Sequence, residues 1–152
     1  MKNDTITLEA IQARQDELVA MIAAFNAAKT VITIPAATIE LHPGEHYAGL
    51  VLNDDCTPSH HLVLMAARPD RRMSWEAAIS WASKVGGALP TRREVFPICA
   101  HCRDHVRDDW HWSSEMYSAG AWACYSGSGN QATIHNKAEL LALAVRRIPI
   151  GD

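Results

Sequence analysis

Residues 86–94 read Gly-Gly-Ala-Leu-Pro-Thr-Arg-Arg-Glu, and this stretch decides most of the expected fold. Gly86 is suited to ending a helix because glycine adopts a positive φ without the steric cost that other residues meet. Thr91 and Glu94, just after Pro90, have the spacing of a capping box, in which each side chain accepts a backbone hydrogen bond at the start of a helix. The stretch therefore predicts the end of one helix and the beginning of another.

The two helices on either side of this stretch have their own signals. The first is capped by Ser74 and has one apolar face, made by Trp75, Ala78, Ile79 and Ala82. The second is expected to run to about Arg103, although Pro97 lacks a backbone donor and should shorten or break it.

Strands are expected before and after the two helices. Runs rich in β-branched, aromatic and small apolar residues predict strands at 47–52, 61–66, 110–114, 121–126, 131–135 and 141–148. Turn-forming residues at 53–58 and 127–130 join four of these strands into two hairpins. Early and late strands are thus available to pair around two embedded helices, which predicts an α+β domain of antiparallel strands.

An amphipathic helix is expected ahead of this domain, over about residues 7–29. Its apolar stripe consists of Leu8, Ile11, Leu18, Ile22 and Phe25. The helix either packs on its own domain or forms a short coiled coil that joins two or three copies of the chain. Residues 30–35 follow as a short strand or an extended connector. The chain is therefore divided into a helix with its connector at 1–36 and a domain at 37–152.

Composition limits the function classes. A chain of 152 residues with 48% hydrophobic and 20% charged residues can bury a core of its own as one domain. The net charge of −3 gives no basic footprint for nucleic acid. No apolar run approaches the roughly 20 residues that span a bilayer, and the first residues do not resemble a secretory signal. We expect a protein that is cytoplasmic when made, that does not insert into membranes and that keeps its four cysteines as free thiols.

Five segments, taken in order, resemble one known family. They are Pro-Gly-Glu-His-Tyr-Ala-Gly at 43–49, Trp-Glu-Ala-Ala at 75–78, the stretch at 86–94, Trp-Ser-Ser-Glu at 112–115 and Ala-Val-Arg-Arg at 144–147. The family is the bacterial and phage domain family that includes the C-terminal domain of Lcl-type collagen-like adhesins, whose fold is C-type-lectin-like. The resemblance covers about residues 37–148. It implies a stable scaffold that presents irregular loops, as in adhesins and phage receptor-binding tips, and it implies no particular reaction.

Two departures from lectin relatives narrow the expected ligand. The Glu-Pro-Asn, Gln-Pro-Asp and Trp-Asn-Asp sequences that bind calcium and sugar are absent, so no such calcium site is expected. Acidic residues outnumber basic ones from Ala37 onward, which disfavours the sulfated polysaccharides that Lcl-type adhesins recognise.

One cysteine pair raises the possibility of a metal. Cys99 and Cys102 are three residues apart, and on a continuous helix His105 would follow one turn later on the same side. A fourth ligand would still be needed, and the chain has no second pair at this spacing. The sequence favours partly buried thiols and no metal or other cofactor. A metal-dependent enzyme, or a zinc-stabilised domain that uses Cys99, Cys102 and nearby histidines, stays the alternative.

The other polar residues do not form a recognisable catalytic site. Residues 42–46 match the letters of the zinc-peptidase motif H-x-x-E-H, but Pro43 and Gly44 specify a turn in place of the helix that this motif requires. Strand alternation should send one of His60 and His61 outward and the other inward. We therefore expect a protein that is not an enzyme.

Aromatic and polar residues of the last hairpin form the expected recognition surface: Tyr117, Trp122, Tyr125, Ser128, Asn130 and His135. They lie where the family fold usually displays its binding face, and tyrosine and tryptophan make large, rigid contacts. Trp122 also fits the core, so Tyr117 and Tyr125 are the better candidates for exposure.

The expected function is a binding module, phage or prophage encoded, that recognises a protein or a glycan. It is either an adhesin-like tail-tip component of a virion or an intracellular inhibitor that docks on a host protein. The N-terminal helix would make it a homo-oligomer, a dimer or a trimer.

Overall fold

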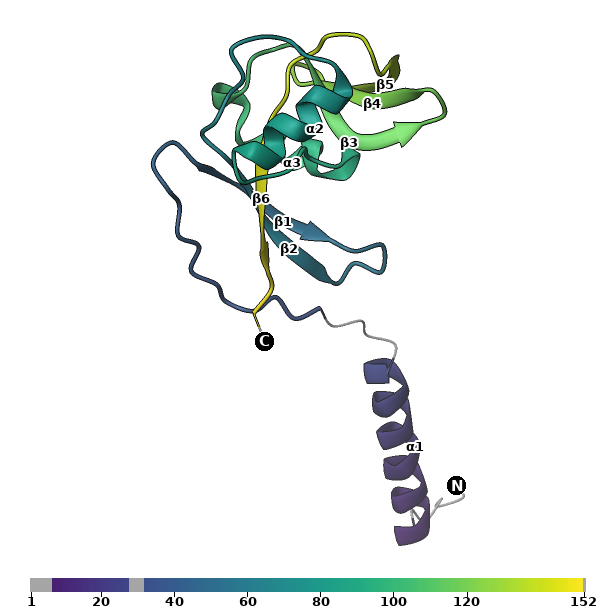
Figure 1. Ribbon diagram of the computed structural model, residues 1–152. Helices are drawn as coiled ribbons and strands as arrows, with labels where there is room; N and C mark the ends of the chain where they lie inside the picture. Colours follow the sequence, from purple (N-terminus) through teal and green to yellow (C-terminus); the bar gives the residue numbers. More distant parts are fainter. Residues whose placement is uncertain (1–6, 28–31, 152) are drawn as a thin grey trace. The chain divides into compact units, whose positions relative to one another are not determined.

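A computed structural model describes residues 7–27 and 32–151 (Figure 1). The chain divides into two compact units, residues 1–33 and residues 34–152, close to the predicted boundary. The first unit contains the helix α1 (Leu8–Ala27), and residues 28 and 29 of the longer predicted helix lie outside the described residues. Residues 32–35 form neither helix nor strand, so the described part of the predicted connector is not a strand.

The second unit is α+β, as predicted. In chain order its elements are β1 (His46–Leu52), β2 (Pro58–Leu64), α2 (Trp75–Lys84), α3 (Arg92–His101), the 3-10 turn η1 (Arg103–His105), β3 (Trp110–Tyr117), β4 (Gly120–Tyr125), β5 (Asn130–His135) and β6 (Val145–Pro149). One antiparallel sheet has the order β1-β2-β6, and the other has the order β3-β4-β5. The predicted pairing of an early strand with a late one is confirmed, since β6 lies against β2.

Both predicted helix caps are present. The Ser74 side chain accepts a hydrogen bond from the backbone of Ala77, and Thr91 and Glu94 form the reciprocal capping box. Gly86 has a φ of +83°, the conformation that ends α2. The second helix stops at His101, earlier than predicted, and it continues through Pro97 without a break. Residues 103–105 form η1 instead.

The closing strand is shorter than predicted. We expected residues 141–148, but β6 begins at Val145. The backbone of the preceding segment bonds to several elements in turn: Leu141 exchanges hydrogen bonds with Trp110 and Trp112, and the Ala144 carbonyl accepts one from Met65. Because these partners lie on different elements, the segment crosses the domain interior and does not extend a single sheet.

The core has two parts, and α3 lies between the two sheets (Figure 1). One cluster joins the β1-β2-β6 sheet to α3, and the other joins the β3-β4-β5 sheet to α2. Trp112 is fully buried in the second cluster, and its Nε1 donates to the Met73 carbonyl at 2.8 Å. Trp112 therefore anchors this part of the core, whereas Trp122, which also fitted the core from the sequence, is only partly buried.

Two neighbouring arginines of β6 tie distant segments together. Arg146 binds the buried carboxylate of Glu45, with its Nη2 2.6 Å from Oε2. Arg147 binds the buried carboxylate of Glu94 through two hydrogen bonds of 2.6 and 2.7 Å. The segments at 43–49, 86–94 and 144–147, which the sequence singled out separately, therefore meet in these two ion pairs.

Glu45 makes the stability of the folded chain depend on pH. The hydrogen bond from Arg146, together with those from His42, lowers the pKa of Glu45 from 4.5 to about 2, although burial opposes the shift. Because this pKa is lower in the folded chain than in the unfolded one, the stabilisation is complete above pH 4.5 and is lost as the pH falls through about 2. Urea denaturation at pH 7 and pH 3 should show a smaller loss of stability in Glu45→Gln than in the wild type.

Glu139→Gln is the control for that measurement, since Glu139 is exposed. It should keep the wild-type difference between the two pH values. An equal difference in the wild type and in Glu45→Gln would exclude Glu45 as the source.

Candidate functional site

The predicted recognition residues divide between the two faces of the β3-β4-β5 sheet. Trp122 pairs with Thr133, and Tyr125 pairs with Asn130. Positions three apart on a strand point to opposite faces, so Trp122 and Tyr125 are separated by the sheet. The ring of Tyr125 packs edge-on against Trp110, with 5.7 Å between centroids.

Tyr117 and Trp122 are brought together. Their ring centroids are 6.0 Å apart, and the Tyr117 side chain is 64% exposed. His135 shares their face, because both His135 and Tyr117 pair with Gly120. Ser128 lies in the loop between β4 and β5, and Asn130 pairs on the face of Tyr125. Of the six predicted residues, three therefore share one face.

Arg92 completes this surface, and the sequence analysis missed it. Its guanidinium carbon lies 3.5 Å from the centroid of a Trp122 ring, a cation–π contact. The Arg92 Nε donates to Gln131 Oε1 at 2.8 Å, and Gln131 Nε2 donates back to the Arg92 carbonyl at 2.9 Å. The carboxylate of Glu115 accepts from the Arg92 backbone at 2.6 Å. We call Arg92, Tyr117 and Trp122 the aromatic patch.

The only signal for Arg92 in the sequence was its place directly after the cap residue Thr91. That place puts it in the first turn of α3, but it does not say which strand the side chain reaches. The contact follows from how α3 packs on the β3-β4-β5 sheet.

The predicted convergence of Cys99, Cys102 and His105 on one ion is not found. Cys102 is buried at the end of α3, where its thiol lies 3.9 Å from the Tyr47 carbonyl. Cys99 interacts with the thiol of Cys124 on β4, and this contact lowers the pKa of Cys99. His105 stacks on His46 with 3.4 Å between ring centroids. Because the helix ends at His101, the three side chains do not share a helical face.

No group of three or more His, Cys, Asp or Glu residues in the described ranges is placed to hold a metal ion. The metal-based alternative therefore has no site in this part of the chain.

The remaining histidine candidates have structural partners. The His60 Nε2 donates to the buried Glu94 carboxylate at 2.7 Å, and His61 forms a hydrogen bond of 2.9 Å with the Tyr47 hydroxyl. His60 is partly buried and His61 is buried. Alternation predicted that one of the two side chains would point outward, but neither is exposed. Both histidine side chains are held by hydrogen bonds to other residues of the fold.

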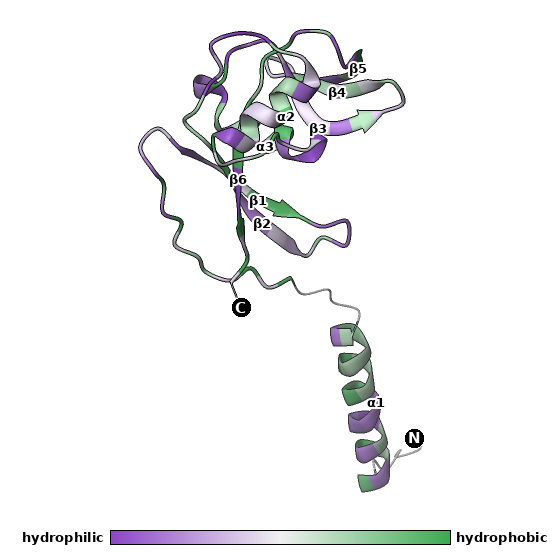
Figure 2. Ribbon diagram, viewed as in Figure 1, coloured by the Kyte–Doolittle hydropathy of each residue, from purple (hydrophilic) through white to green (hydrophobic). Residues whose placement is uncertain are grey.

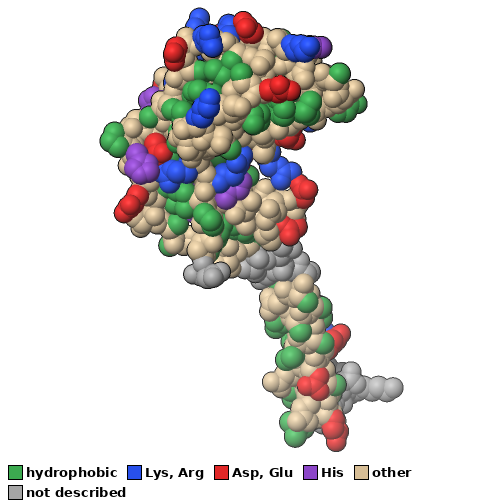
Figure 3. Space-filling view, in the orientation of Figure 1, with side chains coloured by type: hydrophobic (Ala, Val, Ile, Leu, Met, Phe, Trp, Pro, Cys, Tyr) green, Lys and Arg blue, Asp and Glu red, His purple; other side chains and the backbone are tan. Residues whose placement is uncertain are grey.

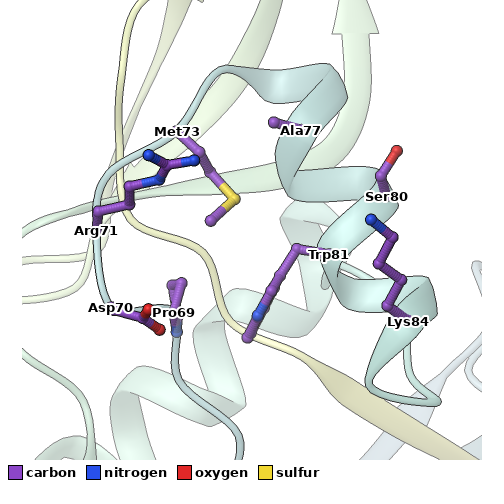
Figure 4. A pocket seen from close by; sticks show the side chains of 8 residues that line it. All are labelled: Pro69, Asp70, Arg71, Met73, Ala77, Ser80, Trp81 and Lys84. Atoms are coloured by element: carbon purple, nitrogen blue, oxygen red, sulfur yellow. The ribbon is translucent and has the colours of Figure 1, made fainter.

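A recess between α2 and the loop at 69–73 is a second candidate surface (Figure 4). It has a volume of about 360 Å³ and is lined by Pro69, Asp70, Arg71, Met73, Ala77, Ser80, Trp81 and Lys84. Figure 4 shows Trp81 facing the recess from α2, with Arg71 and Met73 across from it. Sequence analysis selected none of these residues, because the loop and the helix meet only in the folded chain.

Charge does not concentrate on the visible face of the 34–152 unit. Figure 3 shows Lys and Arg side chains interspersed there with Asp and Glu. The same pattern appears in the ion pairs, where Arg72 binds Asp109 and Arg103 binds Asp108. The site is thus distinguished by its aromatic groups and by one stacked arginine.

No protein-family model and no curated protein matches this chain. None of its described helices is long and apolar enough to cross a membrane.

Proposed function

We propose that this chain is a non-enzymatic binding module, phage or prophage encoded, that recognises a protein or glycan through a rigid C-type-lectin-like scaffold. It serves as an adhesin-like tail-tip component of a virion or as an inhibitor of a host protein. The observation that carries the proposal is the aromatic patch, in which an arginine is held on a tryptophan beside an exposed tyrosine.

The patch has the features of a binding hot spot. Tyrosine, tryptophan and arginine are the residues that most often contribute binding energy at interfaces. Arg92 and Gln131 hold each other through two hydrogen bonds, so little side-chain freedom is left to lose when a partner binds. The strands beneath are fixed by the core around Trp112.

Assembly of several chains through α1 would bring several aromatic patches together on one particle. None of its residues is buried, and its apolar side chains at positions 8, 11, 18, 22 and 25 are all more than half exposed. Figure 2 shows hydrophobic and hydrophilic residues along the whole helix. These positions are three, four or seven residues apart, which suits a coiled coil that we propose joins two or three copies. Several patches on one particle would then bind with avidity.

A photo-crosslinking experiment tests the patch. We expect a benzophenone amino acid at position 117 to give a discrete adduct with a host-cell protein or with a bacterial surface glycan. Excess unmodified wild-type protein should abolish the adduct, and excess Tyr117→Ala should compete at least tenfold more weakly. Tyr117 is so exposed that Tyr117→Ala should change the free energy of unfolding by less than about 0.5 kcal/mol.

Position 116 supplies the matched control. Met116 is 49% exposed on the same strand, and its side chain lies on the opposite face from that of Tyr117. The same crosslinker there should give no competed adduct. Equal adducts from 116 and 117, or none from 117 against either class of partner, would contradict the proposal.

A further inference from the structure

A second pocket lies apart from the aromatic patch and has a buried histidine in its wall. It has a volume of about 310 Å³ and is lined by Arg68, Pro69, Asp70, His105, Arg107, His111, Leu141, Ala142 and Leu143. We call it the His111 pocket. Its polar groups come from two segments that are distant in sequence, residues 68–70 and residues 105–111.

His111 is 3% exposed, and its protonation is set by the backbone. Its Nδ1 donates to the Asp109 carbonyl at 3.0 Å, so the proton is on Nδ1 and Nε2 has a lone pair. Burial is the main cause that lowers the pKa of His111 from 6.5 to about 4, which keeps the imidazole neutral at pH 7.

The Nε2 of His111 opens on the pocket. It has no hydrogen-bond partner within residues 7–27 and 32–151. Since no fully buried side-chain nitrogen or oxygen in those ranges lacks a partner, Nε2 must be accessible, and the pocket that His111 lines is the space it reaches. A neutral acceptor is thus presented to a cavity whose wall also contains charged side chains.

Arg68 presents a fixed positive charge to the same cavity. Its guanidinium donates to three backbone carbonyls, those of Met65, Ala67 and His105. No described carboxylate pairs with it. Burial lowers the pKa of Arg68, whereas the carboxylate partner of Arg147 raises the pKa of that residue. The charge is therefore held in position and is not neutralised.

The other charged groups around the pocket leave it positive. Arg107 is on the rim, 4.0 Å from the Asp109 carboxylate, which also binds Arg72. His105 stacks on His46, whose pKa is lowered by burial and then by the nearby charges of His105 and Arg68. Asp70 is the one carboxylate among the lining residues.

We propose that the His111 pocket binds phosphate in a form that still carries a proton. That proton is donated to Nε2 of His111, and the other oxygens accept hydrogen bonds from Arg68 and Arg107. Sulfate and carboxylates have no proton to donate at neutral pH, so their oxygens would face the lone pair of Nε2. A phosphomonoester retains its last proton only below a pH of about 6. The site should therefore prefer inorganic phosphate.

Calorimetric titration tests the preference for phosphate over sulfate. The full chain is titrated with sodium phosphate and with sodium sulfate at pH 7 and constant ionic strength. We expect phosphate to bind at least tenfold more tightly than sulfate. Arg107→Ala should weaken phosphate binding about tenfold. Arg103→Ala is the matched control, because Arg103 is also an exposed arginine that pairs with an aspartate, and it does not line the pocket. It should bind phosphate like the wild type.

Nitrogen NMR of the histidine rings gives a readout that does not depend on a variant. The Nε2 resonance of His111 should shift with phosphate and not with sulfate. Methyl phosphate should bind at pH 5.5 and bind at least fivefold more weakly at pH 7.5. Equal affinity for phosphate and sulfate, an unmoved Nε2 resonance, or equal binding of methyl phosphate at both pH values would overturn the proposal.

Discussion

Replacing Glu94 with alanine is expected to lower the free energy of unfolding by about 3 kcal/mol. The Glu94 carboxylate is 1% exposed and accepts hydrogen bonds from three elements: the Thr91 backbone at the start of α3, His60 on β2 and Arg147 on β6. Burial raises the pKa of Glu94, but the bonds from Arg147, Thr91 and His60 outweigh it, so the net pKa is lowered.

The size of the effect follows from what the substitution leaves behind. Removing one partner of a buried ion pair costs about 3–5 kcal/mol because the other charge stays without compensation. The Arg147 side chain is 35% exposed and can recover some hydration, which places the value at the lower end. Loss of the capping-box bond to Thr91 adds to the cost. Urea denaturation monitored by tryptophan fluorescence measures the change in the free energy of unfolding.

The control is an exposed ion pair on the same helix. Arg93 binds Asp54, and their side chains are 57% and 90% exposed. Arg93→Ala should therefore cost less than about 1 kcal/mol. If Glu94→Ala and Arg93→Ala destabilise the chain equally, the bonds of Glu94 do not hold the β1-β2-β6 sheet to α3.

Glutamates at two inner positions of α1 are expected to abolish the proposed dimer or trimer. Residues 8, 11, 15, 18, 22 and 25 form a regular three-four repeat, with Gln15 as its one polar member. In the double variant Leu18→Glu, Ile22→Glu, like charges of neighbouring copies would face each other in the seam. Sedimentation velocity should show a dimer or trimer for the wild type and a single chain for this variant.

A charge-matched variant separates assembly from net charge. Ala13 and Ala20 lie on the outer side of the same repeat, so Ala13→Glu, Ala20→Glu adds the same charge away from the seam. This variant should keep the mass of the wild type. A monomeric wild type, or equal masses for the two double variants, would show that α1 joins no copies.

Signals within a few residues determined where α2 and α3 begin and where α2 ends. Ser74 and Thr91 each bond a backbone group three residues away, and Gly86 adopts its positive φ from its own lack of a side chain. The N-terminal helix and the two hairpins were also predictable, because strand and turn preferences act over short distances. The α+β class followed from the order of these elements.

Contacts across the fold were decided only by the tertiary structure. Arg92 reaches Gln131, Arg147 reaches Glu94, and His111 and Arg68 share a pocket, although each pair is far apart in sequence. The sequence analysis grouped Tyr125 with Trp122, although the two residues are three apart on β4 and alternation along that strand puts their side chains on opposite faces. Local chemistry determines the kind of element and the capped ends of a helix, whereas the partner of a side chain depends on the packing of α3 between two sheets, which no short stretch specifies.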